Sequence, residues 1–344
     1  MNANAAPQPG RVVSFGEVLL RLAAPARELL LQHQRLEPSF CGAEANVAVA
    51  LAGFGHDARL VTALPDNALG IAARQTLRGL GVTVAAQTVA GSRLGLFFLQ
   101  PGAMTRPANV TYDRGGSAFA TIDPGAYDWR AVLSGADWLF VSGITAALGD
   151  GALAALGDAI AAARAAGARI AFDTNFRPAL WHGREAEAAT ILRELSCAAD
   201  LLFAGRRAAG MMTGTSFSAG DPDDGFRAAA EAMFALSPRL KQMAATRRTV
   251  HSSDRQALAG LLADREGLSI SRTIALENIV DRVGTGDAFA AGVVHGLIAG
   301  FGRDATIGFA ATCAEWAHSV PGDFLRASVA DIAAVAAGGG DVRR

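Results

Sequence analysis

The stretch that decides the fold is VDRVGTGDAFAAG, residues 280–292, and an apolar helical pattern continues from it to Ile298. Gly284 and Gly286 allow backbone N–H groups to converge on an anion, and a helix that starts near Gly286 directs its positive dipole end at the same point. Asp287 follows directly, where a carboxylate can take a proton from a hydroxyl that attacks a phosphoryl group. The stretch therefore predicts a phosphate cradle with Asp287 as catalytic base.

A plainer interpretation of these residues is a glycine turn in which Asp287 only caps a helix. The complete stretch is more specific, because an apolar strand pattern precedes it and it lies late in the chain. It is not a Walker A motif, since no Gly-Lys-Ser/Thr follows, nor a Rossmann fingerprint, which follows the first strand of a chain. It closely resembles the C-terminal signature of the ribokinase-like carbohydrate kinases.

Short apolar runs alternate with Ala-rich helical stretches through most of the chain, which is typical of an α/β protein with a mostly parallel central sheet and helices on both faces. This pattern agrees with the ribokinase-like fold that the resemblance implies. The expected strands include 11–15, 58–63, 138–142, 169–173 and 200–203, and the expected helices include 43–53, 68–81, 151–167, 184–195 and 224–236.

Two segments, 18–40 and 92–118, interrupt this alternation with short strands and turns. They predict a small β-sheet lid that covers a ligand and also pairs subunits, so we expect a homo-oligomer that forms through the lid. The prediction is one kinase domain over 11–335, with flexible tails at 1–10 and 338–344.

Composition narrows the kinds of partner. The 344 residues are 51% hydrophobic, enough for a large core, and the formal net charge of −1 comes without a basic cluster. A small-molecule ligand is therefore expected, and nucleic acid is not. The three cysteines have no CxxC spacing and the six histidines no metal-ligand spacing. With no signal peptide and no apolar run of membrane-spanning length, we predict a cytoplasmic protein without a membrane partner.

A second motif, FCGAEANVAVAL at residues 40–51, resembles the Gly-Gly-x-x-x-Asn-x-Ala signature of the same family, with Cys41 in place of the first glycine. Gly42 would permit close approach of a sugar, and Asn46 offers it both a donor and an acceptor. Alone, the segment fits an amphipathic helix with a solvated Asn equally well. Together with the distal stretch, it favours a sugar site.

Between residues 11 and 331 the chain resembles the 2-keto-3-deoxygluconate kinase branch. The segments that carry this resemblance are RLGLF 93–97, YDR 112–114, SGIT 142–145, DTNFR 173–177 with LW 180–181, and PGDF 321–324. The resemblance implies that Arg114 and Arg177 bind the carboxylate of a sugar acid. A planar guanidinium matches a carboxylate, whereas a neutral hexose needs no such pair.

The same resemblance implies that Tyr112 and Ile144 line the sugar, and that Phe97 takes the place of a usual tyrosine, which removes a hydroxyl. It directs Asn175 toward the nucleotide phosphates. The further nucleotide residues that it implies are Thr246, Arg248, Gly284, Thr285 and Gly286, and the cofactors are ATP and Mg²⁺.

Two segments depart from the family pattern. Residues 205–208, GRRA, replace an acidic segment that organises magnesium, so we assign no metal ligand. Residues 249–253, TVHSS, replace a glycine-rich continuation, so adenine contacts stay unassigned.

The predicted function is ATP-dependent phosphorylation of a terminal hydroxyl of 2-keto-3-deoxygluconate or a close sugar acid. One alternative is a neutral-sugar kinase of the fructose or ribose type, which the arginine pair argues against. The other is a catalytically weak sugar- or nucleotide-binding homologue, which the retained Asp287 argues against.

Overall fold

A ten-stranded sheet forms the body of the protein in the computed structural model, which describes residues 9–218 and 220–338. Its strands are β1 (Arg11–Phe15), β4 (Asp57–Pro65), β5 (Thr83–Val89), β8 (Trp138–Ser142), β9 (Arg169–Asp173), β10 (Leu201–Phe203), β11 (Gln242–Val250), β12 (Arg255–Asp264), β13 (Leu268–Ile270) and β14 (Ile274–Glu277). Their order is β13-β12-β11-β10-β9-β8-β1-β4-β5, and β14 also pairs with β12. Pairing is parallel from β11 to β5 and antiparallel around β12.

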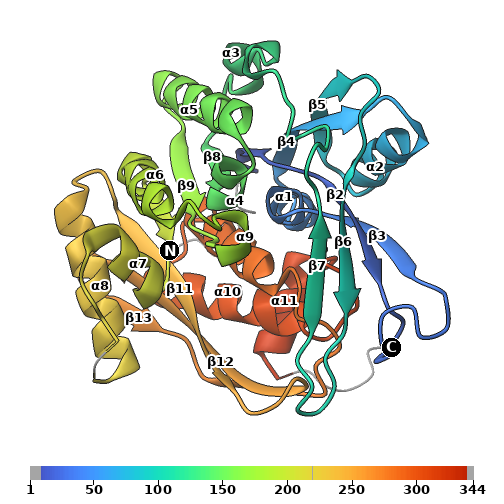
Figure 1. Ribbon diagram of the computed structural model, residues 1–344. Helices are drawn as coiled ribbons and strands as arrows, with labels where there is room; N and C mark the ends of the chain where they lie inside the picture. The colour runs from blue at the N-terminus through green and yellow to red at the C-terminus, as the bar shows by residue number, and fades with distance from the viewer. Residues whose placement is uncertain (1–8, 219, 339–344) are drawn as a thin grey trace.

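Helices cover both faces of this sheet (Figure 1). One face packs against α1 (Ala43–Gly53), α2 (Ala68–Gly79), α9 (Thr285–Ile298), α10 (Arg303–Ala317) and α11 (Val329–Ala336). The other packs against α3 (Trp129–Val132), α4 (Gly143–Ala147), α5 (Asp150–Ala165), α6 (Glu185–Ala198), α7 (Arg206–Thr213) and α8 (Pro222–Leu236). The predicted ribokinase-like α/β fold is confirmed.

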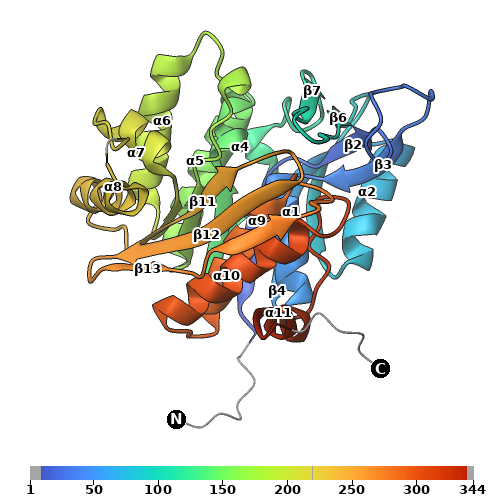
Figure 2. The same cartoon turned by 90° about the horizontal axis from the view of Figure 1, so that it is seen from below.

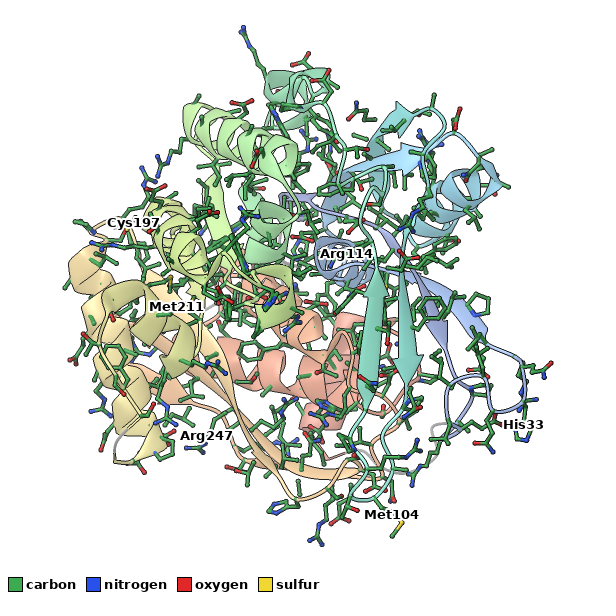
Figure 3. The ribbon with its side chains drawn as sticks, in the orientation of Figure 1. His33, Met104, Arg114, Cys197, Met211 and Arg247 are labelled. Carbon is green, nitrogen blue, oxygen red and sulfur yellow. The ribbon has the colours of Figure 1, made fainter. Side chains whose placement is uncertain are left out.

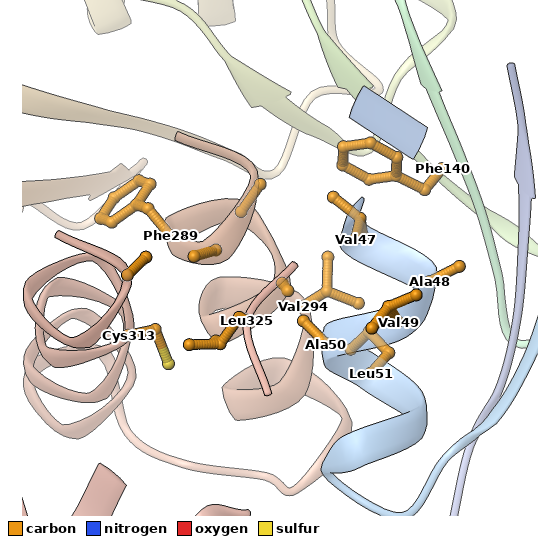
Figure 4. Close-up of a cluster of buried hydrophobic side chains, with 14 of the residues drawn as sticks. Val47, Ala48, Val49, Ala50, Leu51, Phe140, Phe289, Val294, Cys313 and Leu325 are labelled. Carbon is orange, nitrogen blue, oxygen red and sulfur yellow. The ribbon is translucent and has the colours of Figure 1, made fainter. Parts of the chain in front are cut away.

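Helix α9 is held between α1 and α10, and this fixes where its N-terminus lies. Val47 of α1 and Val294 of α9 belong to the same buried apolar cluster (Figure 4). On the other side, a Cβ on Gly292 would lie 2.6 Å from the Cα of Ala310, so glycine is what lets α9 and α10 approach so closely. The first turn of α9 therefore has little freedom to shift.

A separate four-stranded sheet, here called the small sheet, has the order β3-β2-β6-β7 and lies apart from the large sheet (Figure 2). Its strands are β2 (Leu19–Ala23), β3 (Glu37–Cys41), β6 (Gly95–Gln100) and β7 (Asn109–Asp113), which lie in the two predicted insertions except that β3 continues one residue beyond 18–40. Phe97 and Leu99 lie in its buried apolar cluster, and Val283 packs against this cluster. The small sheet thus contacts the stretch that leads into α9.

Most predicted elements form within one to three residues of the predicted bounds. Helix α2 ends at Gly79 rather than at 81, because Gly81 has a φ of 86°, a left-handed conformation that ends a helix. The predicted tails at 1–10 and 338–344 fall mostly outside the described residues, so the domain boundaries stay a prediction. Among the described residues, no helix is both long and apolar enough to span a membrane.

Candidate active site

The N-terminus of α9 forms an open cradle. Gly284 is the N-cap with a φ of 78°, and a Cβ there would lie 2.4 Å from the backbone oxygen of Asp323. Gly286 is exposed, and a Cβ there would meet nothing within 4 Å. One glycine is therefore needed for the turn, while the other leaves backbone amides open beside the first turn of the helix, where an anion is favoured. Thr285 lies between them.

Asp287 is held by the second motif. The Nδ2 of Asn46 in α1 donates to the Oδ2 of Asp287 at 2.6 Å, and the Oδ1 of Asn46 accepts from the N–H of Gly42 at 3.3 Å. Gly42 has a φ of 151°, and a Cβ there would lie 2.1 Å from the backbone oxygen of Glu17. Sequence reasoning assigned Asn46 to the sugar and missed this hydrogen bond, which joins the two motifs directly.

Two half-buried carboxyl groups, Asp287 and Asp173, belong to this part of the site. Burial raises the pKa of Asp287 well above its usual range, the nearby charges of Asp173 and Asp323 raise it further, and Asn46 and Arg177 lower it. Burial also raises the pKa of Asp173, to about 6. Such shifts bring the pKa of a carboxyl group closer to neutral pH, where a general base is most effective. Asp173 was missed as a functional candidate, although it ends a parallel strand, where ligand sites gather.

The carboxyl ends of the parallel strands bring several predicted residues to one edge. In the pairing register, Ser142, Asp173 and Phe203 lie side by side at the ends of β8, β9 and β10. Just beyond this level come Ile144 in α4, Asn175 after β9, and Thr246 with Arg248 in β11. Asn175 has a φ of 36°, rare for a residue other than glycine, and its N–H donates to the Oδ1 of Asp173 at 2.9 Å.

Arg114 is buried and already has an internal partner. Its Nε donates to the Oε2 of Glu17 at 2.8 Å, its Nη2 contacts the same oxygen, and Ser117 donates to Oε1 of Glu17 at 2.5 Å. The guanidinium lies 5.5 Å from the ring centroid of Tyr112, which in turn lies 5.9 Å from that of Phe97. These three predicted sugar residues are thus together, and Figure 3 labels Arg114. Glu17 was missed.

Arg177 contrasts with Arg114. It is exposed, and among the described residues no carboxylate forms an ion pair with it. Its charge nevertheless lowers the pKa of both Asp173 and Asp287, so the guanidinium lies near these carboxyl groups. Arg177 is therefore a cation at the site whose donors are free for a ligand.

The model of the pfkB family carbohydrate kinases matches residues 10–325. The chain belongs to this family. A crystal structure of 2-dehydro-3-deoxygluconokinase from Thermotoga maritima is similar with a TM-score of 0.90 and 34% identity, covering 96% of this chain and 100% of that one. The 2-dehydro-3-deoxygalactonokinase of Haloferax volcanii is 30% identical over 95% of this chain and 97% of its own. The 2-dehydro-3-deoxygluconokinase of Bacillus subtilis is 29% identical over 84% and 83%.

These relatives confirm two predictions, that the protein is a phosphotransferase acting on carbohydrates and that it resembles the 2-keto-3-deoxygluconate kinase branch. The name 2-dehydro-3-deoxygluconate denotes the same compound as 2-keto-3-deoxygluconate. The relatives differ between gluconate and galactonate substrates, which are epimers that share the carboxylate.

Within 9–218 and 220–338, no three His, Cys, Asp or Glu side chains group as metal ligands. In segment 205–208, which departs from the family pattern, the Nη1 of Arg206 donates to the backbone oxygen of Phe217 at 3.2 Å, and Arg207 is exposed. Mg²⁺ usually keeps several waters and binds through one or two carboxylates together with substrate phosphates.

A hollow of about 760 Å³ lies between α8, the β12–β13 turn and Arg303 at the start of α10, away from the predicted catalytic residues. Two of its three arginines have internal partners. Arg303 pairs with Asp264, and Arg265 donates to carbonyl oxygens at the end of α8. None of the predicted site residues lines this hollow.

Proposed function

We propose that this kinase transfers the γ-phosphoryl group of ATP to the terminal hydroxyl of 2-keto-3-deoxygluconate or its galactonate epimer. The observation that carries the proposal is Arg177, a cation without an ion-pair partner among the described residues, close to the catalytic carboxyl groups. A sugar carboxylate would supply its missing partner. The substrates named for the relatives support the same class of compound.

Asp287 has the surroundings of a general base. Asn46 occupies Oδ2, so Oδ1 remains to accept the proton of the attacking hydroxyl. As the hydroxyl oxygen attacks the phosphoryl group, the amides at Gly284 to Asp287 and the positive end of α9 would stabilise the transferring negative charge. The elevated pKa of Asp287 makes its carboxylate a stronger proton acceptor than an exposed aspartate.

The open space beside Gly286 fits the phosphates of ATP, because no side chain fills it. Thr246 and Arg248 are exposed on β11 and available on the nucleotide side. Bound Mg²⁺ would neutralise phosphate charge, as it does in other sites for nucleotide phosphates.

The two arginines would not contribute equally to carboxylate recognition. Glu17 already occupies Nε and Nη2 of Arg114, whereas Arg177 keeps its whole fork. Arg177 would therefore make the stronger contact, with Arg114, which directly follows β7, adding a donor. The partial occupation of Arg114, together with Phe97 in place of a tyrosine, is what keeps a neutral-sugar kinase as the second candidate.

The test compares kcat/KM for 2-keto-3-deoxygluconate and fructose in wild type, Arg177→Ala, Arg177→Lys and Arg114→Ala. Loss of a charge-assisted hydrogen bond should weaken transition-state binding by about 1.5 to 3 kcal/mol, or roughly ten- to a hundredfold in kcat/KM. This loss should affect the sugar acid alone and be greatest for Arg177→Ala, with partial rescue by Lys, which lacks the planar fork. Arg130→Ala, at an exposed arginine of α3, is the control. Equal losses on both sugars would contradict carboxylate recognition.

A further inference from the structure

An arginine of the small sheet lies buried between two carboxyl groups next to the catalytic cradle. Arg21 in β2 donates through Nη1 to the Oδ1 of Asp323 at 2.5 Å and through Nη2 to the Oδ2 of Asp281. Their exposed fractions are 5% for Arg21, 5% for Asp323 and 9% for Asp281. Charges this deeply buried persist only when they are paired, so each member depends on the others.

Asp281 organises the backbone that leads into the cradle. Its Oδ1 accepts the N–H groups of Arg282 at 2.7 Å and Val283 at 3.1 Å, and its Oδ2 accepts that of Gly322 at 3.1 Å. A carboxylate that holds three amides fixes the path of both segments. Arg21 binds this carboxylate, so it reaches the start of the decisive stretch directly.

Asp323 supports the cradle from its other side. Its backbone oxygen packs so closely on Gly284 that a Cβ there would come within 2.4 Å. The Asp323 charge also raises the pKa of Asp287, which shows that it lies within electrostatic reach of the proposed base. Asp281 and Asp323 hold the backbone on the two sides of Gly284. The bridge by Arg21 therefore fixes the position at which the first turn of α9 begins.

The bridge also has an electrostatic consequence. Two carboxylates beside a site for phosphate would repel the transferring group, and a guanidinium between them offsets this repulsion. In the small sheet, Arg21 lies opposite Phe97, which lies opposite Tyr112. The same row of residues therefore joins the predicted sugar side of the small sheet to the cradle.

We propose that Arg21 is a positioning residue, which bridges Asp281 and Asp323 so that the cradle and Asp287 are aligned for phosphoryl transfer when the small sheet is seated. The inference requires only that the protein is a carbohydrate kinase and does not depend on the identity of the sugar. A residue with this role should affect turnover far more than sugar binding, because it touches neither substrate.

The experiment measures kcat, sugar KM and thermal midpoint for Arg21→Lys, using whichever sugar the wild type phosphorylates fastest in a panel of acids and neutral sugars. An ammonium keeps the charge but cannot span two carboxylates as a planar fork. Small misplacement of catalytic groups lowers rates by as much as about a hundredfold, so kcat should fall roughly ten- to a hundredfold with sugar KM within about threefold. Arg35→Lys, at an exposed arginine paired with Glu28 in the same part of the chain, should leave all three quantities unchanged.

The variant Arg21→Met/Asp323→Asn covers the case in which Arg21→Lys does not fold. It removes one positive and one negative charge together and leaves Asp281 bound to its three amides. The proposal requires this protein to be folded with low kcat and nearly normal sugar binding by calorimetry. A folded protein with wild-type kcat in either variant would overturn it, as would parallel losses of kcat, sugar affinity and thermal midpoint. A wild type that phosphorylates only neutral sugars would refute the sugar-acid assignment and leave this test intact.

Discussion

At the scale of single residues, the contact between Asn46 and Asp287 is central to the site. It joins residues 241 positions apart, and it links the segment around Gly42 to the proposed catalytic base as well as to the predicted sugar site. Their resemblance to family signatures was enough to identify both motifs. The contact itself requires α1 and α9 to pack side by side, which no local pattern specifies.

The Asn46→Ala variant should change the pH dependence of turnover. The Asn46 hydrogen bond lowers the pKa of Asp287, against burial and the charges of Asp173 and Asp323, and Arg177 lowers it too. Without Asn46 the pKa rises further, so the base is protonated over a wider range. The higher pKa lowers the fraction of deprotonated base, so kcat should fall on the acid side and recover at high pH.

The measurement is kcat between pH 5.5 and 9 for wild type, Asn46→Ala and Asn109→Ala, whose side chain is exposed on β7. The Asn109 variant should follow the wild-type profile. A loss in Asn46→Ala that is the same at every pH would count against the base assignment.

At the scale of elements, α1 is tied to the strand ends by a buried acid. Glu44 accepts hydrogen bonds from Ser142 at 2.6 Å and Thr145 at 3.2 Å, and Gly16 makes room for it, since a Cβ there would lie 2.0 Å from its Oε2. Burial, opposed by these hydrogen bonds, raises the pKa of Glu44 from 4.5 to about 7. Folding therefore favours the protonated form of this side chain.

The Glu44→Gln variant should flatten the dependence of stability on pH. Because the folded-state pKa is the higher one, the native state binds the extra proton between pH 4.5 and about 7. The contribution of Glu44 to the free energy of unfolding is thus greatest below pH 4.5 and declines by roughly 3 kcal/mol as pH rises through 7. Gln cannot titrate, so this decline should disappear.

Urea denaturation at pH 5, 6, 7 and 8 measures this effect. Glu277→Gln, at an exposed residue of β14, is the matched control and should keep the wild-type slope. Retention of the same slope in Glu44→Gln would mean that another group causes it.

At the scale of the whole molecule, the order of strands and helices follows from local periodicity, and this is why β1, β8, β9 and α1 form at the predicted bounds. The ion pairs that assemble the site do not follow from it. Glu17 and Arg114 are 97 positions apart, and Arg21 and Asp281 are 260 apart. Such pairs are specified by the fold as a whole, so residues like Glu17 and Arg21 gave no local signal. Oligomerisation through the small sheet stays a prediction.

The measurement that tests the account most directly is ADP release by the wild-type protein with ATP and Mg²⁺ across sugar acids and neutral sugars. Asp287→Asn serves as the blank, because loss of a general base lowers kcat by about a hundredfold or more. We expect kcat/KM for 2-keto-3-deoxygluconate or its galactonate epimer to exceed that for fructose and ribose by at least roughly tenfold. Faster turnover of a neutral sugar, or no turnover of any sugar by folded protein, would contradict the assignment as a sugar-acid kinase.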